Sequence, residues 1–199
     1  MPFPKGTNSN HPKLGSAIKV EPIRTKKAIA DIKHMLGRSP RDLCLFTLGI
    51  NTAYRANELL SIRVGQVRGL EAGDVIDLKQ SKTDRYRQVT LNPIAISAIQ
   101  QLLASRSCTD GDYLFWSQQG QVLQVPTVTN MVKRWCLSAG LRGNYGSHSL
   151  RKTWGLWQYK RGTPIPLLME AFGHQSQRQT MAYLGIQAKE MAQIFEMEL

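Results

Sequence analysis

The chain has 199 residues, and its 26 lysines and arginines exceed its 14 aspartates and glutamates by a formal charge of +12. This length suffices for one substantial domain with its own core. A charge excess of this size favours a polyanionic partner, nucleic acid first, because phosphates that are neutralised by basic side chains release counterions. Three cysteines in no close pair argue against a disulfide framework or a thiolate metal site. No apolar run reaches the ~18 residues of a membrane span, so we expect a cytoplasmic protein without a membrane partner.

The first 36 residues divide into an irregular part and a helical part. Residues 1–22 are rich in proline, glycine, asparagine, serine and lysine and show no apolar periodicity. We interpret them as an extended basic arm, which either lies against DNA or has no role. Apolar residues recur at helical spacing over 25–36, and Ser39 and Pro40 suit the N-cap and first turn of a second helix.

The next segment, T-A-Y-R-A-N-E-L-L, places Arg55 and Glu58 one helical turn apart. At that spacing Glu58 can pair with Arg55 and fix its rotamer, which leaves the remaining guanidinium donors free to bind a phosphate. The ordinary alternative is a surface ion pair that contributes only a few tenths of a kcal/mol. Spacing alone favours this alternative.

Between Asp74 and Leu91 the apolar period changes to that of a strand, interrupted by polar turn residues. This pattern predicts an antiparallel β-hairpin. The turn carries Lys82, and Lys79 lies nearby on the preceding strand. A lysine in a turn is ordinarily solvated, so spacing alone assigns neither lysine a function.

Three further elements are expected before the last quarter of the chain. A helix begins at Asn92, a short strand covers 113–116, and another helix covers about 126–138. Lys133 and Arg134 on the last of these helices either contact the DNA backbone or form a solvated face.

The segment from residue 147 to 186 carries the residues best suited to chemistry. A helix that begins just before His148 places it on one face with Arg151. A guanidinium binds phosphate through two parallel hydrogen bonds and an imidazole titrates near neutrality, so this pair suits a phosphate under attack. His174 follows a predicted short helix, and Tyr183, nine residues later, is a candidate attacking group.

These pieces, in this order, resemble the signature of the tyrosine recombinase (phage integrase) family. The matching segments are R-A-N-E-L at 55–59, K-T-D-R-Y-R-Q-V at 82–89, H-S-L-R at 148–151, G-H at 173–174 and Tyr183. The resemblance implies an α+β fold that is mostly α-helical, with a small antiparallel β-sheet. Two positions depart from the usual pattern: Tyr54 stands where leucine is more usual, and Lys152 stands where histidine is frequent.

The resemblance also implies a reaction, DNA strand cleavage and rejoining through a 3′-phosphotyrosine intermediate, with no metal, ATP or other cofactor. Tyr183 would be the nucleophile. Arg55 and Arg151 would hold the non-bridging phosphate oxygens, where negative charge grows in the transition state. Glu58 would orient Arg55.

Three more residues receive roles in proton transfer and hydrogen bonding by the same resemblance. His148 would be the base, and Lys82 the acid that protonates the departing 5′ oxygen. His174 would donate a hydrogen bond to the phosphate. Lys152 joins Lys133 and Arg134 as a candidate DNA contact.

We expect three parts: the arm at 1–22, a catalytic domain at 23–186, and an apolar-faced tail helix at 187–199. In the family such a tail docks onto a neighbouring protomer, so we expect a monomer or weak oligomer that forms a homotetramer on two sites of double-stranded DNA. Accessory DNA-bending proteins are possible partners, and docking of the tail on its own protomer stays open. With only about 25 residues before the first helix, the chain resembles the short recombinases that invert promoter segments, and we expect it at the nucleoid.

Two other activities compete with recombination. A type IB topoisomerase-like relaxase would share the same arginine, lysine, histidine and tyrosine set. A DNA-binding regulator on a recombinase-like fold would occupy sites without breaking strands, although no catalytic position is missing from the sequence. An RNA-binding function rests on charge alone.

Overall fold

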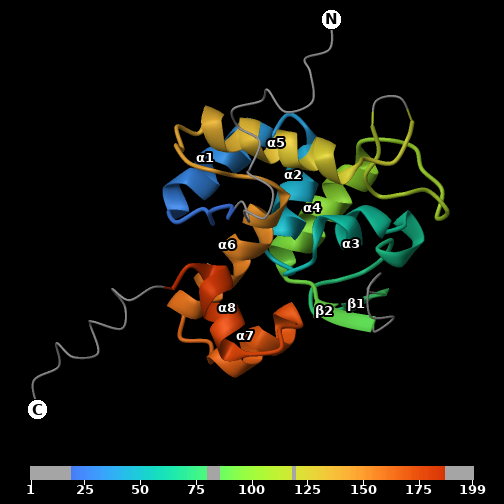
Figure 1. The fold of residues 1–199 in the computed structure, drawn as a ribbon. Helices are drawn as coiled ribbons and strands as arrows, with labels where there is room; N and C mark the ends of the chain where they lie inside the picture. Colours follow the sequence, from blue (N-terminus) through green and yellow to red (C-terminus); the bar gives the residue numbers. More distant parts are fainter. Residues whose placement is uncertain (1–18, 80–85, 118–119, 187–199) are drawn as a thin grey trace, which may run out of the picture.

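The structure is a computed structural model that describes residues 19–79, 86–117 and 120–186. Lys82, the predicted tail helix at 187–199 and most of the predicted arm lie outside these ranges. Within them the chain forms eight α-helices, one short 3-10 helix and a two-stranded antiparallel sheet (Figure 1). None of these helices is both long and apolar enough to cross a bilayer.

The elements follow one another along the chain with short connections. In order they are α1 (Lys26–Leu36), α2 (Pro40–Gly49), α3 (Ala56–Ser61), η1 (Val64–Gln66), β1 (Val75–Lys79), β2 (Tyr86–Thr90), α4 (Pro93–Ala104), α5 (Val125–Ser138), α6 (Ser147–Lys160), α7 (Ile165–Phe172) and α8 (Gln177–Leu184). This mostly helical content with one small antiparallel hairpin confirms the fold class expected from the sequence. The short strand expected at 113–116 does not form. Tyr113 forms an isolated bridge with Arg63, and Trp116 forms one with Val122, so each pairing extends over one residue only.

Polar caps begin two of the predicted helices. The Thr25 hydroxyl accepts a hydrogen bond of 3.2 Å from the amide of Ala28 at the start of α1. The Asn92 side chain accepts one of 2.9 Å from the amide of Ala95 at the start of α4. Each cap satisfies a backbone donor that the first turn of a helix leaves unpaired.

The main core surrounds α2, whose residues 44–49 are all buried. Its Phe46 packs edge to face against Trp135 of α5, with ring centroids 6.0 Å apart. Gly49 at the end of α2 lies so close to α6 that a Cβ atom there would be 2.9 Å from the Cβ of Leu150. This close approach brings the residue after Leu150, Arg151, to the end of α2 and the start of α3.

A second, smaller core joins α7 and α8 to the other end of α6. Figure 1 shows these two helices gathered there, with the hairpin beside α3. The buried members of this second core are Ala53, Leu168, Phe172, Leu184 and Ile186. Gly155 of α6 has no side chain to separate the helices, and a Cβ there would overlap Phe172 and Leu184. The candidate site lies where the two cores meet.

Candidate active site

Arg55 and Glu58 are joined at the start of α3. Arg55 is the N-cap residue, and its backbone amide donates a hydrogen bond of 2.6 Å to Oε2 of Glu58. Its guanidinium Nη1 donates a second bond, of 2.9 Å, to Oε1. Glu58 is only 3% exposed, so this is not the surface ion pair that was the alternative. The predicted pairing is confirmed, and it leaves one third of the Arg55 side chain exposed.

Two more arginines share the Glu58 carboxylate. Nη1 of Arg87 lies 3.7 Å from Oε2 of Glu58, and Nη1 of Arg151 lies 3.9 Å from the same atom. Three guanidinium groups therefore face one buried carboxylate, an excess of positive charge that suits a bound phosphate. Arg87 was not among the predicted site residues. A charged residue on the inner face of a half-buried strand was the signal that could have identified it.

Arg151 lies on α6 and is 2% exposed. Its Nη2 donates a hydrogen bond of 2.6 Å to the carbonyl oxygen of Phe172, whereas Nη1 is buried without a hydrogen-bond partner. Burial lowers the pKa of Arg151 to about 10, with Tyr183 opposing this shift and the neighbouring arginines adding to it. Arg151 is therefore a cation at neutral pH with an unsatisfied donor, which a phosphate oxygen would satisfy.

His148 precedes Arg151 by one turn of α6, as predicted, and is exposed. The pKa of His148 lies below its ordinary value. The main cause is desolvation of the ring, and repulsion from Arg151, Arg55 and Lys152 adds to it. This shift favours the neutral form of the imidazole. A neutral imidazole can accept a proton, as the predicted role requires.

His174 follows a left-handed residue, Gly173 (φ 64°), which ends α7 and turns the chain. The His174 ring stacks on Phe172 with centroids 5.2 Å apart, and its Nδ1 lies 3.0 Å from Oγ1 of Thr180. Desolvation is the main cause that lowers the pKa of His174 to about 4, and repulsion from the surrounding arginines adds to it. Thr180 is fully buried. It was not among the predicted residues.

Tyr183 lies on α8 with its hydroxyl buried and without a hydrogen-bond partner. Its ring contacts Phe172 and His174 edge to face, with centroids 5.1 Å apart in both pairs. Desolvation raises the pKa of Tyr183, and the nearby Arg151 opposes this shift. A buried hydroxyl without a partner is costly and uncommon, which marks this phenol as a candidate for chemistry.

A cavity of about 410 Å³ opens beside Tyr183 and extends to His148. Its lining comprises Lys19, Val20, His148, Lys152, Gln179, Ala182 and Tyr183. Lys152 is 7% exposed, and its ammonium lies 4.8 Å from the centre of the Tyr183 ring. The residue that replaces the family's frequent histidine is therefore buried against the candidate nucleophile.

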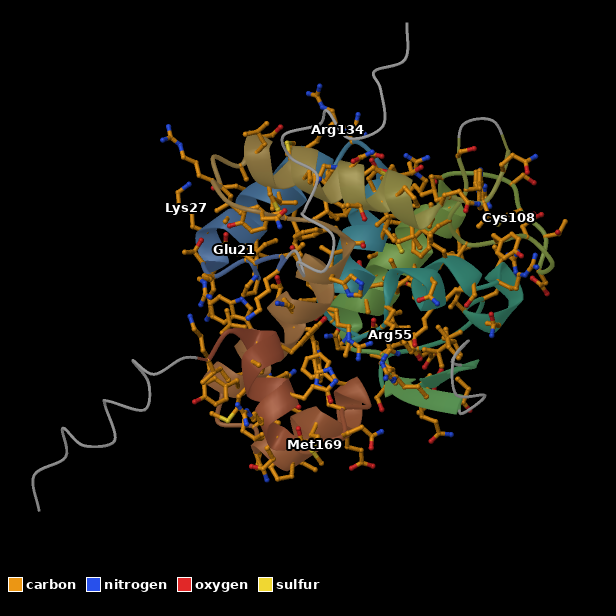
Figure 2. The ribbon with its side chains drawn as sticks, viewed as in Figure 1. Glu21, Lys27, Arg55, Cys108, Arg134 and Met169 are labelled. Carbon is orange, nitrogen blue, oxygen red and sulfur yellow. The ribbon has the colours of Figure 1, made fainter. Side chains whose placement is uncertain are left out.

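The structure brings six of the predicted residues into one place: Arg55, Glu58, His148, Arg151, His174 and Tyr183. Lys82 lies outside the described residues. Lys133 and Arg134 are exposed on α5, and Figure 2 shows Arg134 pointing away from the molecule, well apart from Arg55. Their contact with DNA stays a prediction.

Arginines that share one carboxylate, two histidines with lowered pKa values and a desolvated phenol lie together, and this set of groups suits attack on a phosphodiester. Residues 25–190 match the model of the phage integrase family, and the chain belongs to that family. The resemblance inferred from the motifs is thereby confirmed.

Two relatives and one crystal structure show how far the similarity extends. A probable integrase/recombinase, YoeC of Bacillus subtilis, is 29% identical over 169 residues, which cover 84% of this chain and 90% of YoeC. The tyrosine recombinase XerH of Helicobacter pylori is 31% identical over 147 residues, which cover 72% of this chain and 40% of XerH. A crystal structure of XerH bound to palindromic difH substrate, a post-cleavage complex, has a TM-score of 0.69 and 26% identity over 90% of this chain and 54% of that one. The chain thus spans most of YoeC but about half or less of XerH.

Proposed function

We propose that this protein is a site-specific DNA recombinase that cuts and rejoins strands through a 3′-phosphotyrosine intermediate, without metal or ATP. The observation that carries the proposal is the buried, unpaired hydroxyl of Tyr183 beside Arg151. Membership of the phage integrase family and the similarity to XerH, solved in complex with its difH substrate, support double-stranded DNA as the substrate.

The proposed reaction exchanges one phosphate ester for another. The phenolic oxygen of Tyr183 attacks the scissile phosphorus while His148 accepts its proton. The bond from phosphorus to the 5′ oxygen breaks, and Lys82 protonates the departing oxygen. A 5′ hydroxyl from the partner strand then reverses these steps and releases Tyr183, so the ester bond is conserved without an external energy source.

The remaining residues stabilise the transition state. Arg55 and Arg151 bind the non-bridging oxygens of the phosphate, and their excess positive charge balances the charge that develops there. Glu58 holds Arg55 in place. His174, neutral at physiological pH, donates a hydrogen bond to the phosphate.

The proposal extends to assembly and location. The protein acts as a homotetramer on two DNA sites, with the segment 187–199 as the tail that docks on a neighbour and residues 23–186 as the catalytic domain. Lys133, Arg134 and Lys152 contact the DNA backbone. The protein acts in the cytoplasm, at the nucleoid.

The test uses wild-type protein and Tyr183→Phe with nicked duplexes drawn from the DNA that flanks the gene, in the presence of a chelator. We expect the wild type alone to form a protein–DNA adduct that survives denaturant, joined through a 3′ phosphate. Tight binding without an adduct would favour the DNA-binding regulator. Plasmid relaxation regardless of sequence, without strand exchange, would favour the topoisomerase-like relaxase.

A further inference from the structure

Arg87 occupies a position where the strand pattern calls for an apolar residue. It pairs with Leu78 across the hairpin and is 9% exposed. Its neighbours on the same face of the two strands are Ile76, Leu78 and Val89, all apolar. Burial lowers the pKa of Arg87, and Glu58 opposes that shift. A cation is retained here at an energetic cost, so the contacts of its guanidinium indicate what it does.

The Arg87 guanidinium contacts the segment that carries Arg55. Its Nη1 donates a hydrogen bond of 3.2 Å to the carbonyl oxygen of Ala53 and lies 3.7 Å from the Glu58 carboxylate. Ala53 has a φ of 56° and is the only non-glycine residue with positive φ in the described part of the chain. A left-handed alanine is strained, and its surroundings must hold it in place.

A second bond fastens the same two segments together. The buried hydroxyl of Tyr54 lies 2.9 Å from the carbonyl oxygen of Ile76 and 3.2 Å from that of Arg87. Arg87 thus holds the backbone before Arg55 with its side chain, and Tyr54 holds the hairpin in return. The residue that replaces the family's usual leucine therefore belongs to this connection.

Arg87 also reaches the turn that precedes His174. Its Nη2 lies 3.6 Å from the position that a Cβ atom would take on Gly173. This nitrogen is buried and has no hydrogen-bond partner. One guanidinium therefore contacts both the segment before Arg55 and the turn before His174.

We propose that Arg87 is a positioning residue for strand transfer: it holds Ala53 in its left-handed conformation and shares Glu58, and thereby directs Arg55 at the scissile phosphate. This inference rests on the proposed function. It distinguishes Arg87, which acts through Arg55, from an arginine that merely stabilises the hairpin.

The first test compares Arg87→Met with Arg68→Met. Arg68 is a matched control because it also pairs with one carboxylate, Asp110, and donates to one carbonyl, that of Cys108, but on the exposed surface. We expect Arg87→Met to slow adduct formation on a nicked phosphodiester by about 10- to 100-fold. Arg68→Met should leave the rate unchanged.

The second test uses the same variants with a nicked duplex that carries an uncharged methylphosphonate at the scissile position. Because this centre has lost the negative charge that Arg55 neutralises, the loss caused by Arg87→Met should shrink to about threefold or less. A purely structural role predicts equal losses on both substrates, and that result would overturn the proposal. So would a wild-type rate for Arg87→Met.

Ala53→Gly provides a rescue test. Glycine adopts positive φ without steric cost, so Ala53→Gly added to Arg87→Met should recover part of the lost rate on the phosphodiester. It should leave the rate of Arg68→Met unchanged. A double variant no faster than Arg87→Met would count against the role assigned to Ala53.

Sulfate provides a readout that does not depend on catalysis. We expect sodium sulfate to raise the Tm of the wild type more than sodium chloride at equal ionic strength, and this difference to be lost in both Arg55→Ala and Arg87→Met. If the wild type formed no adduct on any duplex, these losses would still support the positioning role, although the proposed function would fail. Sulfate stabilisation that persists in Arg87→Met but not in Arg55→Ala would overturn the positioning role of Arg87.

Discussion

The hydroxyl of Thr180 lies 3.0 Å from Nδ1 of His174, closer than the 3.4 Å that separates it from the carbonyl oxygen of Ser176. When the hydroxyl donates to Nδ1, the proton of the neutral ring resides on Nε2. The tautomer that results has a donor at the nitrogen which does not contact Thr180, as a hydrogen bond to a phosphate requires. A Thr180 hydroxyl that donates to Nδ1, rather than to the Ser176 carbonyl, therefore keeps His174 a donor at Nε2.

The first prediction concerns this pair. Thr180→Val keeps the shape of the side chain and removes the hydroxyl, so adduct formation should slow by about tenfold or more because the ring is no longer held in the donor tautomer. Thr180→Ser keeps the hydroxyl and should stay close to the wild type. Nitrogen NMR of the labelled His174 ring would report the tautomer directly. A wild-type rate for Thr180→Val would refute this role.

The second prediction concerns pH and stability. The pKa of His174 is lowered from an ordinary value of 6.5 to about 4 in the folded protein, so between these values the unfolded chain binds the proton more readily. The free energy of unfolding should therefore fall as pH drops from about 6.5 to about 4. Urea denaturation of the wild type and His174→Gln at several pH values measures this, and the variant should show the shallower fall. Parallel curves would contradict the lowered pKa.

The third prediction concerns the shared carboxylate. Glu58→Gln removes the carboxylate charge that three guanidinium groups share, two of them buried, so the free energy of unfolding should decrease by about 3–5 kcal/mol. Added sulfate should recover part of this loss, because an anion can replace the missing charge. Asp110→Asn, which removes the partner of the exposed Arg68, should change stability little. Equal effects of the two variants would show that burial of Glu58 has no energetic consequence.

The fourth prediction concerns the crossing of α6 with α7 and α8. A Cβ atom on Gly155 would overlap Phe172 and Leu184, so Gly155→Ala should destabilise the protein by about 1–3 kcal/mol. It should also slow adduct formation, because Tyr183 moves with α8. Gly111→Ala, where a Cβ would meet nothing closer than 4.0 Å, is the control. Thermal melts and single-turnover cleavage measure the two effects separately.

Local patterns in the sequence were sufficient for most of the fold. Apolar spacing identified most of the helices and the hairpin, since each periodicity reflects one buried face. No helix was expected at 177–184, where α8 carries Tyr183. Fixed spacing also placed His148 and Arg151 on one helix, and Arg55 beside Glu58. The resemblance to a known family then grouped residues that lie more than a hundred positions apart, which no local pattern could do.

The residues that were missed depend on contacts between distant segments. Arg87 matters because its guanidinium contacts Ala53 and Glu58. Its position on the inner face of the strand predicts an apolar residue, not a charged one. Thr180 meets His174 only because Gly173 turns the chain between α7 and α8. The segment from Tyr113 to Trp116 has strand-forming residues, yet each of its bridges involves one residue only. A strand there would need a longer partner segment, which the local pattern does not specify.

The division into two cores affects what a partly unfolded molecule can do to DNA. Arg55 and Glu58 lie at the start of α3, whose Leu59 and Leu60 belong to the larger core. Tyr183 packs instead against the smaller core, to which α7 and α8 contribute. Segments with few buried contacts open most easily in native proteins. The easiest local opening would therefore withdraw the nucleophile while most of the phosphate clamp stayed assembled, so a partly opened molecule would hold DNA without cutting it.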